Sequence, residues 1–214
     1  MRTIKKLRMK HFIKYSFILL ISITFISCKR CPKNIPKHDL PQEFKDYAVF
    51  PSDSWWVYED SASGLLDTIK LLKFNTDYRN CGGIEACPDL FYIFNGKISS
   101  SFNDSQFVFT GGYNHCGKNA IVLQSYLGYF IYDEDNTTTS LGNYISKINY
   151  LDTYVYNQIT YTNIYKIGVK FYNSSNTFDK IYYWAKFVGP INIFEYSNDS
   201  LLKIKYLKTY HINN

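Results

Sequence analysis

The amino-acid sequence predicts a mainly β fold: an antiparallel meander or curled sheet that follows an N-terminal signal helix and an extended tether. The first observation is composition. The chain holds 21 Tyr and 16 Phe, and aromatic residues make up 19% of it; aromatic and β-branched side chains favour pleated sheets. The second is spacing, because turn signals recur about every 10–15 residues in the C-terminal half. No amphipathic helix of more than about 12 residues is expected between them.

Residues 159–171 give the clearest strand signal. Their side chains alternate between two faces, and one face holds Ile159, Tyr161, Asn163, Tyr165, Ile167, Val169 and Phe171. A period of two predicts a half-buried antiparallel strand. A last alternating strand carries Leu202, Ile204, Tyr206, Tyr210 and Ile212. Its Lys203 and Lys205 are expected to face solvent.

A hairpin is predicted near the start of the body. Residues 54–60 read SWWVYED, and residues 65–74 form a second apolar run after the turn SASG. Strand geometry places Trp55 with Val57 on one face and Trp56 with Tyr58 on the other. We therefore expect one tryptophan to enter the core.

The remaining chain reads as further short strands separated by loops. Gly residues end two apolar runs, and a third run is broken near Gly128. One short helix is expected near residues 141–150. The expected strands are residues 90–96, 106–112, 120–132, 177–189 and 191–196, and the expected loops are residues 75–88 and 133–140.

The N-terminus predicts a secretory signal peptide. Residues 1–14 carry six basic side chains and no acid, and residues 15–26 are the uncharged run YSFILLISITFI. Lys29 and Arg30 end this run well short of the ~20 apolar residues that a spanning helix needs. Translation starts at Met1 or at Met9, since both starts leave a basic segment before the run.

The four residues Phe25 to Cys28, FISC, resemble the lipobox of bacterial lipoproteins, in the relaxed form of Bacteroidota. The resemblance implies cleavage between Ser27 and Cys28, a diacylglycerol on the Cys28 sulfur and an acyl chain such as palmitate on the new amine. The string WWVYEDSASGLLDTI also resembles the first hairpin of small Bacteroidota lipoproteins. That likeness names no activity. The alternatives to a lipoprotein signal are an ordinary cleaved signal with Cys28 as a buried thiol, or a buried core helix.

This resemblance also implies a location and a division of the chain. Asp is absent after Cys28, which favours the outer membrane, and residues 29–33 are basic instead of acidic, which favours its periplasmic face over the cell surface. Residues 1–27 are then the signal, residues 28–43 an extended tether with three prolines, and residues 44–214 a single β-rich domain. The mature part keeps 18 basic and 18 acidic residues, so net charge gives no support for nucleic-acid binding.

Four cysteines remain if Cys28 is acylated: Cys31, Cys81, Cys87 and Cys116. An oxidising compartment favours pairing, and four cysteines allow three connectivities. We favour Cys81 with Cys87, or Cys81 with Cys116, and leave Cys31 unpaired. Zinc is not expected, because Cys81 and Cys87 lie further apart than the usual close pair, and adjacent His115 and Cys116 point apart on a strand.

The sequence offers no catalytic motif and no cofactor site. No G-x-S-x-G or H-E-x-x-H occurs. Lys118 is followed by Asn119, where a phosphate loop needs Ser or Thr. Glu59 and Asp60 point opposite ways on a strand. We therefore expect a non-catalytic binding or structural module of the cell envelope, with a protein, glycan or lipid ligand. The alternatives are a lipid carrier with an apolar cavity and an envelope hydrolase.

Overall fold

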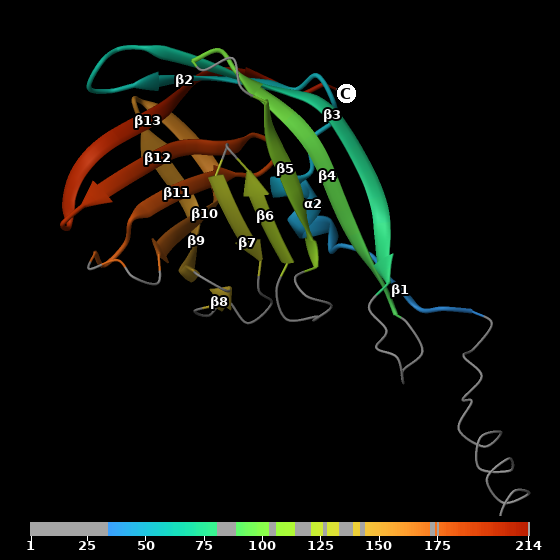
Figure 1. Cartoon of the computed structure of the whole chain (residues 1–214). Helices are drawn as coiled ribbons and strands as arrows, with labels where there is room; N and C mark the ends of the chain where they lie inside the picture. Colours follow the sequence, from blue (N-terminus) through green and yellow to red (C-terminus); the bar gives the residue numbers. More distant parts are fainter. Residues whose placement is uncertain are drawn as a thin grey trace, which may run out of the picture. The chain divides into compact units, whose positions relative to one another are not determined.

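The computed structural model describes residues 34–80, 89–102, 106–113, 121–125, 128–132, 139–141, 144–171, 174 and 176–213 (Figure 1). The chain divides into two compact units, and all the elements below belong to the second, Lys37–Cys81 with Asp89–Asn214. Within the described ranges, no helix has the length and apolar character needed to cross a membrane.

Thirteen strands of the described chain form one hydrogen-bonded sheet. In order they are β1 (Lys37–His38), β2 (Trp55–Asp60), β3 (Leu66–Asn80), β4 (Leu90–Ser100), β5 (Gln106–Tyr113), β6 (Ile121–Ser125), β7 (Gly128–Tyr132), β8 (Thr139–Leu141), β9 (Tyr144–Tyr156), β10 (Ile159–Phe171), β11 (Lys180–Ala185), β12 (Gly189–Ser197) and β13 (Ser200–His211). The predicted mainly β fold is confirmed.

The sheet consists of two meanders joined by the first and last long strands. Its order is β7-β6-β5-β4-β3-β2-β13-β12-β11-β10-β9-β8, and every pair along this path is antiparallel. Short β1 adds to β4 in parallel. The two edges of the sheet, β7 and β8, are therefore consecutive in the chain, and the sheet is not closed between them.

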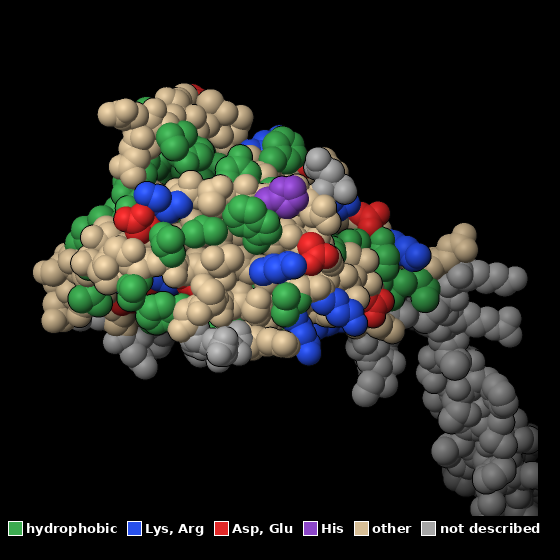
Figure 2. Space-filling model, turned by 90° about the horizontal axis from the view of Figure 1, so that it is seen from above, with side chains coloured by type: hydrophobic (Ala, Val, Ile, Leu, Met, Phe, Trp, Pro, Cys, Tyr) green, Lys and Arg blue, Asp and Glu red, His purple; other side chains and the backbone are tan. Residues whose placement is uncertain are grey.

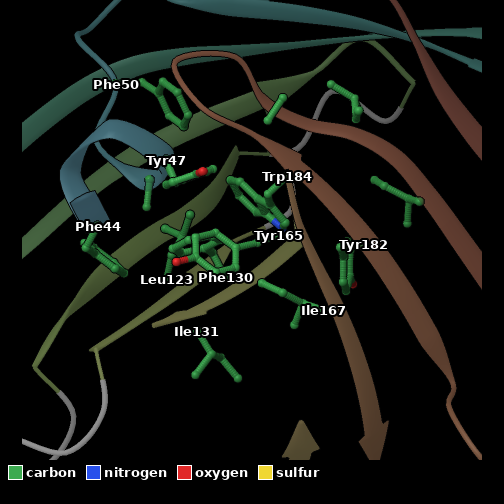
Figure 3. Packing of buried hydrophobic residues seen from close by; sticks show 14 of the residues in the cluster. Phe44, Tyr47, Phe50, Leu123, Phe130, Ile131, Tyr165, Ile167, Tyr182 and Trp184 are labelled. Carbon is green, nitrogen blue, oxygen red and sulfur yellow. The ribbon is translucent and has the colours of Figure 1, made fainter. Parts of the chain in front are cut away.

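The sheet curls until β7 packs against the face of β10 and β11. Gly128 makes this approach possible, because a Cβ there would lie 2.6 Å from the ring of Tyr182. The Phe130 ring centroid lies 5.2 Å from that of Trp184 and 5.6 Å from that of Tyr165. All four large side chains are buried. Figure 3 shows these rings filling the space between the strands.

A short helix, α2 (Gln42–Ala48), packs into the same core. The Phe44 ring lies 5.6 Å from the Phe130 ring, and the Tyr47 ring lies 5.3 Å from it. The Tyr47 hydroxyl donates a hydrogen bond to the Asn163 carbonyl over 2.9 Å. Isolated helices shorter than about 12 residues are marginal in water, so this packing holds α2 in place.

Three expectations about secondary structure differ from the structure. Residues 28–43 were expected to be an extended tether, yet Lys37–His38 pair with β4, Leu40 is buried, and α2 begins at Gln42. The predicted helix near residues 141–150 is wrong, because β8 and β9 cover most of it. The expected loop of residues 75–88 is wrong over residues 75–80, which belong to β3 and pair with β4. Strand pairing and core contacts decide all three cases, and neither leaves a periodic signal in a short segment.

The hairpin and the alternating strand are confirmed, with one irregularity. Trp56 is buried and donates its indole N–H to the Val188 carbonyl over 2.6 Å, while Trp55 stacks on His211. The predicted face of β10 is buried at Tyr165, Ile167 and Val169, but Ile159 is exposed. The alternation fails at Asn163, which has a φ of +55° and lies between two paired positions of the ladder.

Phe130→Ala tests the core at the point where the sheet packs on itself. Removing a fully buried phenylalanine ring leaves a cavity and costs about 3–5 kcal/mol of unfolding free energy. Phe187→Ala is the matched control, because Phe187 is 61% exposed in a turn and its loss should cost less than about 1 kcal/mol. Urea denaturation followed by circular dichroism measures both, and equal losses would contradict this packing.

Candidate functional site

The sequence-predicted site residues Ser27, Cys28, Cys81, Cys87 and Cys116 lie outside the described residues, so the cleavage, lipidation and disulfide assignments stay predictions. Two histidines are described. His38 Nε2 lies 3.0 Å from an Asp89 carboxylate oxygen, and His211 stacks on Trp55. Across the described ranges, no three metal-ligating side chains gather in one place.

A pocket of about 240 Å³ lies beside the β2–β3 hairpin. It combines charges of both signs with apolar side chains, and we name it the charged pocket. Its lining residues are Tyr58, Asp60, Leu65, Asp67, Phe102, Lys203 and Lys205. They come from β2, β3, β13, the β2–β3 turn and the segment after β4.

Strand register places the charged groups together. Lys205 of β13 is the partner of Asp60 on β2, and Asp67 of β3 is the partner of Tyr58. Paired positions present their side chains on the same face of a sheet, and residues two apart on a strand share a face. Lys203 therefore joins Lys205 in the pocket. The expectation that both lysines face away into solvent is wrong.

Two salt bridges neutralise the pocket. The Lys203 ammonium lies 2.5 Å from Asp60, and the Lys205 ammonium lies 3.7 Å from Asp67. The 3.7 Å contact is electrostatic, since it exceeds normal hydrogen-bond length. Asp67 also accepts a 2.6 Å hydrogen bond from the Ser100 hydroxyl, which offsets its burial.

The Lys203 ammonium and the N–H groups of the β2–β3 turn lower the pKa of Asp60. The hydrogen bond from Lys203 is the largest cause, burial opposes it, and the backbone N–H groups of Ala62 and Ser63 add to it. Burial raises the pKa of Tyr58 well above its usual value. Its hydroxyl donates to the Pro190 carbonyl over 2.6 Å. Asp60 is thus ionised and Tyr58 neutral at neutral pH.

The mouth of the pocket is apolar. Leu65 is 53% exposed and Phe102 is 60% exposed. None of the described lining residues is a His, Cys or Ser nucleophile, and a carboxylate held ionised by a lysine is a poor general acid. The arrangement therefore offers a small ligand charged groups of both signs beside an apolar surface.

A row of aromatic rings crosses β9, β11, β12 and β13. Neighbouring ring centroids lie 4.2 to 6.4 Å apart, and the row consists of Phe194, Tyr183, Tyr154, Tyr156 and Tyr206. The Tyr154 hydroxyl accepts a 2.9 Å hydrogen bond from Asn192, and burial raises the pKa of Tyr154 to about 12. The rings contact one another, and Tyr154 and Tyr183 also pack against the hydrophobic core. We therefore assign the row to packing and not to a binding site.

Two further hollows, of about 270 and 340 Å³, are more open to solvent than the charged pocket. One lies over Gly112, where a Cβ would come within 2.5 Å of the Tyr92 carbonyl oxygen, and it is bordered by Arg79 and Gln124. The other lies beside Phe178 and Asp199. The face seen in Figure 2 carries basic and acidic side chains close together, without a broad patch of one sign.

Comparison of the chain with protein-family models, with curated proteins and with solved structures finds no match. Function is therefore argued from this chain's own residues. Sequence reasoning missed the charged pocket. The predicted hairpin places Asp60 and Asp67 on the same face as Tyr58, so the position of the two carboxylates could have been predicted from the sequence. The partner strand that supplies the lysines lies about 140 residues further along the chain and leaves no local signal.

Ser100→Ala tests the buried support of Asp67. Loss of a hydrogen bond to a buried charge costs about 1.5–3 kcal/mol of unfolding free energy. Ser101→Ala is the control, because the exposed Ser101 hydroxyl accepts from the Thr68 N–H, where water replaces it. Urea denaturation distinguishes them. An equal, small effect of both substitutions would show that Asp67 does not depend on Ser100.

Lys203→Met tests the salt bridge to Asp60 through pH. The pKa of Asp60 in the folded chain lies below its ordinary 3.8, so this stabilisation is present above that value and is lost as pH falls through the lowered pKa. The unfolding free energies of wild type and Lys203→Met should differ most near neutral pH and converge in acid. Lys70→Met, which breaks an exposed pair with Asp53, should show a small difference throughout.

Proposed function

We propose that the chain is a lipid-anchored protein of the cell envelope whose β-sheet body is a non-catalytic binding module. The location is proposed as the outer membrane, on its periplasmic face. Support for the anchor comes from the basic segment, the uncharged run and the cysteine of the FISC sequence. Two or three acyl chains on Cys28 would hold a protein firmly, since each buried methylene contributes about 0.8 kcal/mol.

The charged pocket is the observation that carries the binding role. It holds fixed charges of both signs beside two exposed apolar side chains, and its described lining contains no nucleophile with an adjacent base. Many catalytic sites hold such a pair, a metal or a carboxyl group tuned as a general acid. A site of this kind binds and orients a ligand without changing it.

The position of the pocket in the sheet suits an anchored protein. The N-terminal segment joins the sheet at β1, which pairs with Leu90 and Phe91 at the start of β4. The pocket lies near Ser100, at the other end of β4. Ten residues of extended strand span about 33 Å. The pocket is therefore remote from the point where the chain from Cys28 enters the domain.

The two alternatives have less support. A lipid carrier needs an apolar cavity, but the described interior is filled by buried aromatic side chains such as Phe130, Tyr165 and Trp184. An envelope hydrolase needs a nucleophile or a tuned acid and base, and the carboxylates of the charged pocket are engaged by lysine and serine side chains. The binding module remains the preferred proposal.

Cys28→Ser tests the anchor. Wild-type protein should incorporate radiolabelled palmitate and sediment with outer membranes, and Cys28→Ser should do neither, because the acceptor sulfur is gone. Cys31→Ser is the matched control, three residues away, and should behave as wild type. The proposed location fails if Cys28→Ser still takes up label and still sediments.

A further inference from the structure

The size of the charged pocket limits its ligand. Its volume of about 240 Å³ is smaller than the roughly 300–1,000 Å³ typical of sites for drug-sized molecules. A single amino acid or a similarly small molecule fits this space, whereas an acyl chain or an oligosaccharide does not. The ligand is therefore expected to be small and to be held by a few polar contacts.

The charges select a ligand that carries both signs. Two carboxylates and two ammonium groups give the pocket no net charge, so a simple anion or cation would meet as much repulsion as attraction. The lysine side chains are the more exposed, at 33% for Lys203 and 20% for Lys205, against 14% for Asp60 and 8% for Asp67. A zwitterion can place its ammonium near the deeper carboxylates and its carboxylate near the lysines.

The rim selects for an apolar group on that ligand. Leu65 and Phe102 are more than half exposed at the edge of a pocket that is otherwise charged. Burying part of their surface under an apolar side chain is favourable by the hydrophobic effect. Glycine would satisfy the charges and leave this apolar surface in water.

We propose that the charged pocket binds a free α-amino acid with an apolar side chain, such as leucine or phenylalanine. The proposal rests on the proposed binding role and adds its ligand class. The ammonium group of the ligand lies toward Asp60 and Asp67, its carboxylate toward Lys203 and Lys205, and its side chain against Leu65 and Phe102. The contacts are partly exposed, so the affinity is moderate, with a Kd of about 10 μM to 1 mM.

Calorimetric titration of the full chain in a mild detergent provides the test. L-Leucine and L-phenylalanine should bind. N-acetyl-leucine lacks the ammonium and leucinamide lacks the carboxylate, so each should bind at least about tenfold more weakly, as expected for the loss of a charge-assisted contact. Glycine should bind more weakly than leucine, because it leaves the apolar rim uncovered.

Two variants place the binding in this pocket. Lys205→Met should weaken leucine binding at least about tenfold by removing one ammonium. Lys70→Met removes an exposed ammonium paired with Asp53 outside the pocket, and leucine binding should be unchanged. Phe102→Ser alters an exposed side chain with little risk to folding. It should reduce the preference for leucine over glycine even if Lys205→Met fails to fold.

Three results would overturn the proposal. The first is no binding of leucine or phenylalanine at 10 mM, a concentration about tenfold above the weakest expected Kd. The others are equal binding of leucine and N-acetyl-leucine, and unchanged leucine binding in both Phe102→Ser and a folded Lys205→Met. None of these depends on lipidation. If leucine does not bind while Cys28→Ser releases the protein from membranes, the ligand class is wrong and the anchor stands. If leucine binds and Cys28→Ser still takes up label and still sediments with membranes, the anchor is wrong and the site stands.

Discussion

The pairing of β2 with β13 is the constraint on which the rest of the molecule depends. It joins the two meanders into one sheet, and it sets Lys205 opposite Asp60. About 140 residues separate these strands, yet the entropy of closing a loop grows only with the logarithm of its length, by about 0.6 kcal/mol per doubling. Burial of Trp56 and Tyr58 on β2 offsets that cost, because fully buried aromatic side chains contribute strongly to stability.

The curl of the sheet follows from that central pairing. With β2 and β13 in the middle, the edge strands β7 and β8 are consecutive in the chain, and β7 packs on β10 and β11, which are not its neighbours in the strand order. Aromatic side chains then fill the space between the layers, and α2 contributes Phe44 and Tyr47 to it. In the part of the chain that the structure describes, buried side chains fill the face inside the curl, which moves the search for a ligand to the surface.

The charged pocket forms because four ionisable side chains share one face of the sheet beside the β2–β3 hairpin. Asp67 is nearly buried, so the Ser100 hydroxyl and the Lys205 ammonium are needed to offset its desolvation. The same arrangement fixes the positions of the charges, and preorganised polar groups bind a ligand with less loss of freedom. Stability and recognition therefore draw on the same residues, while Leu65 and Phe102 remain exposed for contact.

Local periodicity predicted the strands of residues 54–60, 65–74 and 159–171 and the entry of one tryptophan into the core. The basic segment, the uncharged run and Cys28 are the local features from which the anchor is proposed. Each of these features depends only on residues that are close together in the sequence. Tertiary structure alone decided the pairing of β2 with β13, the helix α2, and the inward direction of Lys203 and Lys205. The physical reason is that a period of two shows which side chains share a face, but the partner strand decides what that face meets.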